Sequence, residues 1–217
     1  GLMLVIAGIA SGFVASLINK KMRAAINLVR EKNEVIDLFG QQISPQIASE
    51  LLKDKSGLTG RRKNVCIMFL DIRGFTPFSE HREPEEVVAY LNSLFSFMIE
   101  IVQAHNGIIN QFLGDGFMAT FGAPVSDPDS RNNAVKASLE IIRRKTIEVE
   151  NGTIPRTRIG IGIHYGEAVT GNIGSEMRKQ YSITGSVVNI ASRIENLTKS
   201  YNTEVLVSEE VISNLNL

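Results

Sequence analysis

The sequence predicts an α+β fold in which helices pack on a largely antiparallel β-sheet, and two features of its hydrophobic pattern support this. Between residues 64 and 217, short apolar runs rich in branched side chains alternate with longer segments whose apolar residues recur every three or four positions. Their order is strand, helix, hairpin, helix, strand, helix and strand, which fits a sandwich with the helices on one face of the sheet. The chain of 217 residues is long enough for such a domain and some further elements.

The composition excludes several kinds of function. The 23 Lys and Arg residues equal the 23 Asp and Glu residues in number, so no general affinity for nucleic acid is expected. Cys66 is the only cysteine, which excludes a disulfide framework and a zinc site built from cysteines. Because it lies in an apolar run, we interpret Cys66 as a packed thiol. His81, His105 and His164 have no metal-ligand spacing, so we interpret them as structural or solvated.

Residues 1–19 are predicted to be part of a transmembrane helix. Residues 2–18 contain no charged side chain, and a basic cluster with Lys20, Lys21 and Arg23 follows. A membrane helix needs about 20 apolar residues, and basic flanking residues favour the cytoplasmic side. We therefore expect a span that the sequence includes only in part, in the inner or plasma membrane, with the rest of the chain in the cytoplasm. A buried helix is the alternative.

Residues 20–52 are predicted to form a signalling helix with a coiled-coil seam. Apolar residues recur there at spacings of three and four, interrupted by Asn33 and Gly40. The repeat is short, so an amphipathic helix packed on its own domain is the alternative. Residues 53–63 are polar with two glycines, which indicates a linker, and they lack the Gly-Lys-Ser/Thr ending of a P-loop.

The first strand of the domain ends in a candidate metal-binding residue. Residues 65–70 form an apolar run typical of a buried strand, and Asp71 follows directly. A turn with Gly74, Phe75 and Thr76 comes next, before a helical region. A carboxylate at a strand end, followed by free backbone N–H groups, suits a divalent cation that itself carries phosphates.

A predicted hairpin over residues 108–122 carries the second candidate. Its tip, Gly114-Asp115-Gly116, lies between two short apolar runs. Two carboxylates from neighbouring strands, Asp71 and Asp115, can hold a pair of Mg²⁺ ions for in-line displacement at phosphorus. Ordinary turn or surface acids are the alternative, because Asp-Gly pairs are common in turns.

The remaining elements follow from periodicity and capping residues. Phe95 and Phe97 lie in an apolar stripe at helical spacing, which we interpret as core or dimer contacts. Ser186 is predicted to cap the helix that follows it. We expect helices over residues 84–105, 127–148 and 186–199. We expect strands over residues 156–169 and 205–207, and a loop over residues 171–180.

Three motifs stand out in chain order: Phe69-x-Asp71-Ile72-x-Gly74-Phe75-Thr76, then Gly114-Asp115-Gly116, then Asn189-x-x-x-Arg193. Together they resemble the class III nucleotide cyclases, the adenylate and guanylate cyclases with a ferredoxin-like catalytic core. The likeness covers residues 64–208. Its specificity comes from the three motifs in this order rather than from any one of them.

The resemblance implies that the chain makes a cyclic nucleotide with two divalent cations, Mg²⁺ or Mn²⁺, at each site. In the family these cations are held by the two acids, here Asp71 and Asp115, and by the backbone carbonyl that corresponds to Ile72. The backbone N–H groups around residues 74–76 receive the terminal phosphates.

The resemblance also assigns Asn189 and Arg193 to catalysis and implies a homodimer. Residues four apart project from the same face of a helix. In the family the Asn orients the ribose and the Arg neutralises charge on the α-phosphate, for which its planar, permanently charged fork is suited. Family members form two sites at a head-to-tail dimer interface, with the metal acids from one protomer and this pair from the other. The alternative is a surface pair in which Arg193 contacts Glu195 or solvent.

Two positions that read the base depart from the usual family residues. Adenylate cyclases commonly have a lysine where this chain has Gln111, and an aspartate or threonine where it has Ser182. Both side chains can donate or accept a hydrogen bond, so the pair is compatible with either purine. Guanylate cyclases typically have an acid and a cysteine at these positions. Since neither is present, ATP is favoured over GTP.

The sequence therefore predicts a membrane-tethered, homodimeric adenylate cyclase. Its catalytic domain includes residues 64–217. The resemblance implies that the domain continues past Leu217 to a further strand and a lysine that binds the triphosphate. The alternatives are a guanylate cyclase and a non-catalytic, dimerising signalling module. A polymerase-like dinucleotide cyclase is disfavoured, because Gly114-Asp115-Gly116-Phe117 lacks the second acid expected in its turn.

Overall fold

The protein is described from a computed structural model, which defines residues 60–175, 179–213 and 215. The predicted membrane segment (residues 1–19) and the predicted coiled-coil helix (residues 20–52) lie outside the described residues. Both therefore stay predictions, and the described residues belong to the domain that comes after them in the chain.

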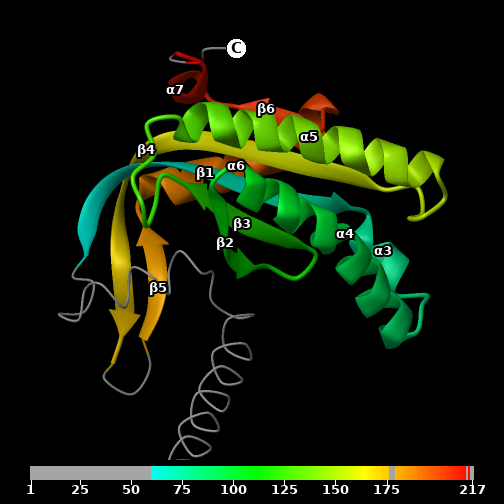
Figure 1. Ribbon diagram of the computed structural model, residues 1–217. Helices are drawn as coiled ribbons and strands as arrows, with labels where there is room; N and C mark the ends of the chain where they lie inside the picture. Colours follow the sequence, from blue (N-terminus) through cyan, green and yellow to red (C-terminus); the bar gives the residue numbers. More distant parts are fainter. Residues whose placement is uncertain (1–59, 176–178, 214, 216–217) are drawn as a thin grey trace, which may run out of the picture. The chain divides into compact units, whose positions relative to one another are not determined.

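The described residues form one mixed sheet with helices packed on it, which confirms the predicted α+β class (Figure 1). The strand order is β2-β3-β1-β4-β5, and β6 pairs with β4 as the one parallel neighbour within the described sheet. Strand β1 lies at the centre, antiparallel to both β3 and β4. The strands are β1 (Arg61–Arg73), β2 (Gly107–Phe112), β3 (Gly116–Phe121), β4 (Arg158–Gly174), β5 (Lys179–Thr184) and β6 (Val205–Val207).

Strand β1 is longer than its apolar run predicts. It pairs with β4 along its whole length, from Arg61 opposite Thr170 to Arg73 opposite Arg158. The last three residues of the predicted linker thus belong to the strand, and Asp71 lies inside the paired region rather than just after it. Hydrogen bonds to β4 extend a strand beyond the segment that its apolar residues mark.

The predicted loop over residues 171–180 is wrong, because β4 continues to Gly174 and β5 begins at Lys179. The two strands form an antiparallel hairpin in which Val169 is opposite Thr184 and Asn172 is opposite Tyr181. Val169 and Ile173 are exposed there, and the segment also contains glycine and asparagine. The end of β4 has no buried apolar face and so gives no clear period-two signal in the sequence, whereas Tyr181 and Ile183 of β5 are both buried.

One face of the sheet is covered by α4 (Pro84–Ala104) and α5 (Ser130–Glu150), and the main core lies between them and the strands. Met68 and Leu70 of β1 are buried there, and so are Phe95 and Phe97, which confirms a core role for both phenylalanines. In the described part of the chain, α4 is the one helix long and apolar enough to cross a membrane, but six of its residues are buried in this core.

Helix α6 (Ser186–Tyr201) lies on the opposite face, so the expectation that all helices share one face is wrong. The reason is in β4, where Gly162 faces away from the main core. A Cβ at Gly162 would overlap the backbone of Glu195 in α6, so the helix packs directly on the strand. The predicted cap is also wrong: the N-cap residue of α6 is Gly185, and Ser186 is the first helical residue.

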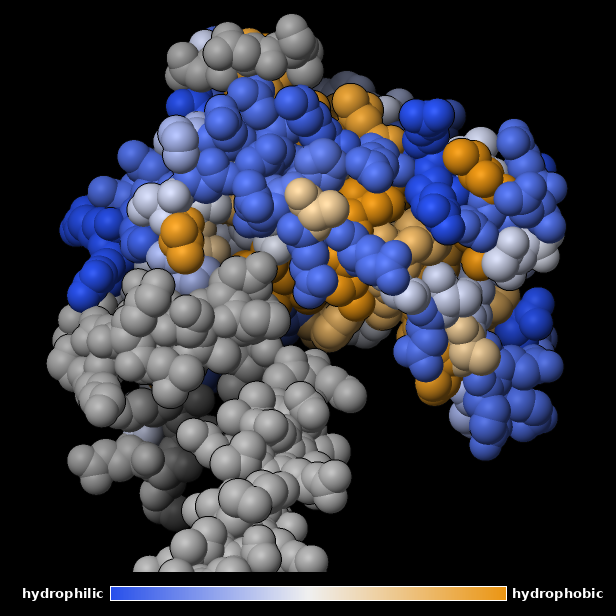
Figure 2. All heavy atoms as spheres, viewed as in Figure 1, coloured by the Kyte–Doolittle hydropathy of each residue, from blue (hydrophilic) through white to orange (hydrophobic). Residues whose placement is uncertain are grey.

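Hydrophobic and hydrophilic residues are unevenly distributed over the surface on the α4 and α5 side (Figure 2). Hydrophilic residues cover much of α5, while hydrophobic residues gather between α5 and α4. A groove lies there, lined by residues that include Phe97, Leu139 and Ile147. It contains none of the site residues predicted from the sequence.

Candidate active site

The structure brings Asp71 and Asp115 together through the pairing of β1 with β3. Gly116, directly after Asp115, lies opposite Asp71. A Cβ at Gly116 would overlap the carbonyl oxygen of Leu70, so only glycine lets the hairpin tip approach β1 this closely. The backbone N–H of Ile72 also donates to the backbone carbonyl of Asp115, with an N···O distance of 3.2 Å. The predicted Gly-Asp-Gly hairpin tip is confirmed, and it is held against the strand that carries the first acid.

The charge around Asp71 suits a cation. Burial raises the pKa of Asp71 above its ordinary value, and the neighbouring Asp115 raises it further, while Arg73 and Lys199 lower it. A positive charge close to both carboxylates would favour the ionised form of Asp71.

The donor atoms available here fit Mg²⁺ or Mn²⁺, which prefer carboxylate and carbonyl oxygens. Among the described residues, no three or more His, Cys, Asp or Glu side chains converge on one metal position. Cations held by Asp71, Asp115 and the carbonyl of Ile72 would therefore need further oxygens from water or from a phosphorylated ligand.

The phosphate-binding turn predicted at residues 74–76 begins the short helix α3 (Phe75–Ser79). Gly74 has a φ of 72°, a left-handed conformation that favours glycine. The N–H groups of Phe75 and Thr76 lie in the first turn and so have no partner within the helix. Thr76 is exposed and Phe75 is half-buried, so the turn presents these groups near the surface beside Asp71.

Arg73 is a site residue that the sequence analysis missed. Its side chain is mostly buried, and Nη1 donates to Oδ2 of Asp71 at 3.2 Å. Nη2 donates to Oε1 of Glu195 at 2.6 Å, to the backbone carbonyl of Glu195 at 3.0 Å, and to the hydroxyl of Thr198. Its position inside the Asp-Ile-Arg-Gly motif was the available signal.

Asn189 and Arg193 are both exposed on α6, which agrees with their placement on one helix face. The residues of α6 buried against the sheet are Val187, Ala191, Glu195 and Thr198. A helix turns by about 100° per residue, so Arg193, two residues from both Ala191 and Glu195, points away from the sheet. The suggested pairing of Arg193 with Glu195 is wrong, because Glu195 is bound by Arg73 on the inner side of the helix.

The two base-reading candidates lie on strands at opposite ends of the strand order. Gln111 is exposed on β2, and Ser182 is half-buried on β5. Strand pairing alone therefore does not bring them together. Gln111 follows a register shift between Ile109 and Gln111 in the β2–β3 pairing.

Two of the three histidines have clear structural partners. Nε2 of His105, at the end of α4, lies 2.8 Å from Oε2 of Glu140 on α5. Nδ1 of His164 lies 2.7 Å from the hydroxyl of Ser208, just before α7 (Glu209–Ile212), a helix not predicted from the sequence. Burial lowers the pKa of His164, and nearby Glu210 opposes this effect. These contacts agree with the interpretation of both residues as structural.

Comparison with known proteins gives consistent results. The family model of the adenylate and guanylate cyclase catalytic domain matches residues 59–217. Adenylate cyclase 1 of Rhizobium meliloti is 41% identical over 162 residues, which are 72% of this chain and 24% of that protein. The chain spans about a third of the length of several other curated relatives.

Solved structures of both cyclase types are similar to the chain. The crystal structure of the guanylyl cyclase Cya2 has 39% sequence identity and a TM-score of 0.63, with coverage of 71% of this chain and 79% of that one. The adenylyl cyclase CyaB from P. aeruginosa has 35% identity and a TM-score of 0.61, with coverage of 72% and 82%.

Proposed function

Because the chain belongs to the family of adenylate and guanylate cyclase catalytic domains, we propose that it converts ATP into 3′,5′-cyclic AMP and pyrophosphate. The observation that carries this proposal is the convergence of Asp71, Asp115 and the turn at Gly74 at one end of β1. The similarity to an adenylate cyclase of Rhizobium meliloti supports the choice of ATP. The similarity to the guanylyl cyclase Cya2 makes GTP the second candidate.

The residues in this site suit the chemistry of cyclisation, in which the ribose 3′-oxygen attacks the α-phosphorus and pyrophosphate leaves. Asp71, Asp115 and the carbonyl of Ile72 would hold two Mg²⁺ or Mn²⁺ ions. When bound, these ions neutralise phosphate charge and make the 3′-hydroxyl more acidic. The N–H groups of Phe75 and Thr76 would bind terminal phosphate oxygens, since unpaired first-turn donors attract anions.

We propose that Asn189 and Arg193 serve the site of a second copy of the chain. In support, Arg193 points away from the sheet face that carries Asp71. In a head-to-tail homodimer, each site would combine the metal acids of one protomer with the Asn and Arg of the other. The Asn would orient the ribose, and the Arg would neutralise charge on the α-phosphate.

A complementation experiment tests this shared site. Asp71→Ala and Arg193→Ala proteins should each be nearly inactive alone. An equal mixture should recover about a quarter of wild-type activity, because half of the dimers are mixed and each mixed dimer has one intact site. No recovery in verified mixed dimers would contradict the shared site.

The base preference is tested by paired kcat/KM measurements with ATP and GTP on the full-length protein with Mn²⁺. We expect a weak preference for ATP, because Gln111 and Ser182 can each donate or accept a hydrogen bond. A residue pair that could only donate at one position and only accept at the other would distinguish the two purines more strongly. Gln111→Glu combined with Ser182→Cys should shift the preference toward GTP. A wild-type preference for GTP would make the chain a guanylate cyclase, and binding without product would make it a signalling module.

We also propose that residues 1–19 anchor the protein in the inner or plasma membrane and that residues 20–52 join two catalytic domains as a coiled coil. The uncharged run over residues 2–18 and the basic cluster after it support the anchor. Full-length protein should sediment with membranes, and deletion of residues 2–18 should reduce this fraction. Unchanged sedimentation would contradict an anchor in this segment.

A further inference from the structure

The last residue of β1, Arg73, joins the strand that carries Asp71 to the helix that carries Asn189 and Arg193. Of the four acceptors around its guanidinium, three belong to α6: the carboxylate and the carbonyl of Glu195, and the hydroxyl of Thr198. The fourth is Oδ2 of Asp71. The guanidinium is therefore held mainly by the helix and reaches the metal-binding acid through one nitrogen.

Two glycines of β4 make room for this arrangement. Gly160 lies opposite Asp71, and a Cβ there would overlap the guanidinium of Arg73. Gly162 lies opposite Phe69, and a Cβ there would overlap the backbone at Glu195. Glycine within a strand is unfavourable for the strand itself. Their presence at both positions allows a charged group to lie between the sheet and α6.

Glu195 decides how the positive charge of Arg73 is shared. The side chain of Arg73 is 13% exposed and that of Glu195 is 8% exposed, whereas that of Asp71 is 30% exposed. The guanidinium is closer to Glu195, at 2.6 Å, than to Asp71, at 3.2 Å. Since an ion pair weakens with distance, Glu195 takes the larger part of this interaction and Asp71 the smaller part.

We propose that Arg73 and Glu195 are positioning residues for Asp71. Arg73 fixes the orientation of the Asp71 carboxylate, and Glu195 holds the guanidinium back, so that the Asp71 carboxylate stays available to a divalent cation instead of pairing fully with Arg73. This inference rests on the proposed function, because it assigns these residues to the same site.

The test measures Mn²⁺ binding by electron paramagnetic resonance in the presence of 3′-deoxy-ATP, which lacks the attacking hydroxyl. Groups that bond to a metal-binding side chain typically change metal affinity by about 10- to 100-fold when they are replaced. Glu195→Gln should weaken Mn²⁺ binding by about tenfold, because the guanidinium then pairs more fully with Asp71. Arg73→Gln should instead strengthen Mn²⁺ binding, because it removes a competing cation, and should lower kcat with ATP, because Asp71 loses its orientation.

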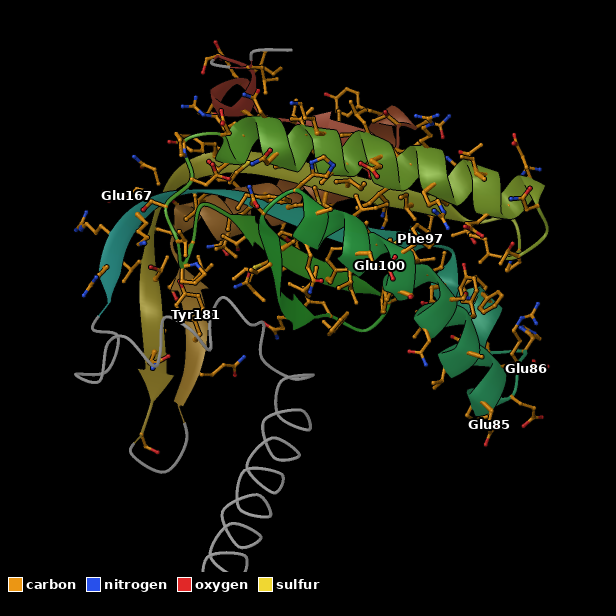
Figure 3. The ribbon with its side chains drawn as sticks, in the orientation of Figure 1. Glu85, Glu86, Phe97, Glu100, Glu167 and Tyr181 are labelled. Carbon is orange, nitrogen blue, oxygen red and sulfur yellow. The ribbon has the colours of Figure 1, made fainter. Side chains whose placement is uncertain are left out.

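The opposite signs separate this role from a purely structural one, in which both substitutions would weaken binding. The matched control is Glu167→Gln (Figure 3). Glu167 of β4 forms an exposed ion pair with Arg62 of β1, in which Nη1 of Arg62 lies 2.7 Å from Oε1 of Glu167. This substitution should change neither Mn²⁺ binding nor kcat. Equal or same-direction effects of Arg73→Gln and Glu195→Gln in folded proteins would overturn the inference.

If the single variants do not fold, the double variant Arg73→Gln/Glu195→Gln decides, because neutral replacement of a buried ion pair is often tolerated. It should bind Mn²⁺ with affinity close to wild type and have a kcat lowered by about tenfold. A wild-type kcat in this variant would overturn the inference while the proposed function stands. A wild-type protein that binds neither Mn²⁺ nor nucleotide would instead overturn the proposed function, and this inference with it.

Discussion

The two faces of the central sheet differ in what they contain, although the same strands form both. On the α4 and α5 face, Met68, Leu70 and Ile72 of β1 pack against apolar side chains. On the α6 face, the residues that alternate with them include Asp71 and Arg73. Successive side chains of a strand point to opposite faces, so one strand can stabilise the domain on one side and carry its chemistry on the other.

The largest expected effect is on the α6 face and concerns activity. Asp71→Asn should lower cyclase activity by at least about 100-fold, because it removes a negative charge that the proposed metal ions need. The control is Asp129→Asn, an exposed acid before α5 whose side chain makes no cap hydrogen bond. Product formation is measured by chromatography, and circular dichroism checks the fold. Near-normal turnover of Asp71→Asn would contradict the assignment of chemistry to this face.

The second prediction compares neighbours in β4 that face opposite sides. Ile161→Ala should lower the free energy of unfolding by about 2–5 kcal/mol, because it opens a cavity in the main core. Gly162→Ala adds only a methyl group, yet it should cost about 1–3 kcal/mol or more, because the new Cβ overlaps the backbone of α6.

Urea denaturation measures both variants, and Gly166→Ala is the control in the same strand. A Cβ at Gly166 would lie 3.4 Å from Val187, an ordinary contact. A Gly162→Ala variant as stable as Gly166→Ala would show that α6 is not packed directly on the strand.

The third prediction compares two ion pairs of β1. Glu195→Gln should lower the free energy of unfolding by about 3 kcal/mol, because the mostly buried guanidinium of Arg73 then loses the nearer of its two carboxylate partners. Glu167→Gln should lower it by less than about 1 kcal/mol, because its pair with Arg62 is exposed. If both variants lost the same free energy of unfolding in urea denaturation, the two ion pairs would be equally accessible to water, which would contradict this prediction.

The smallest expected effect is a pH dependence from His164, which lies on the same face as Gly162. Its pKa is lowered from the ordinary 6.5 by burial. The unfolded chain therefore takes up a proton as the pH falls through 6.5, and the folded chain does so only at a lower pH. The contribution to stability is thus complete above pH 6.5 and is lost as the pH falls toward the folded-state pKa.

Urea denaturation between about pH 8 and pH 5 measures this effect. His164→Gln should lose less stability than wild type over that range, and His81→Gln, at an exposed position, is the control. An unchanged pH profile in His164→Gln would assign the dependence to other groups.

The sequence by itself determined the motifs and most of the elements that carry them. The apolar run before Asp71, the Gly-Asp-Gly hairpin tip and the helix with Asn189 and Arg193 were predictable, because each depends on a local period or a turn residue. Motif order was then enough to indicate the family, which the match over residues 59–217 bears out.

Only the tertiary structure decided which element covers each face. Alternation shows which residues share a face, but it does not show what packs there. The position of α6 depends on Gly160 and Gly162, and the β4–β5 hairpin depends on pairing of β5 with the end of β4, which has no buried apolar face. The pair between Arg73 and Glu195 joins residues 122 positions apart, a contact that no local spacing encodes. Long-range packing therefore placed Arg73 and Glu195 at Asp71, whereas the sequence motifs had already indicated the residues that we propose act in the site.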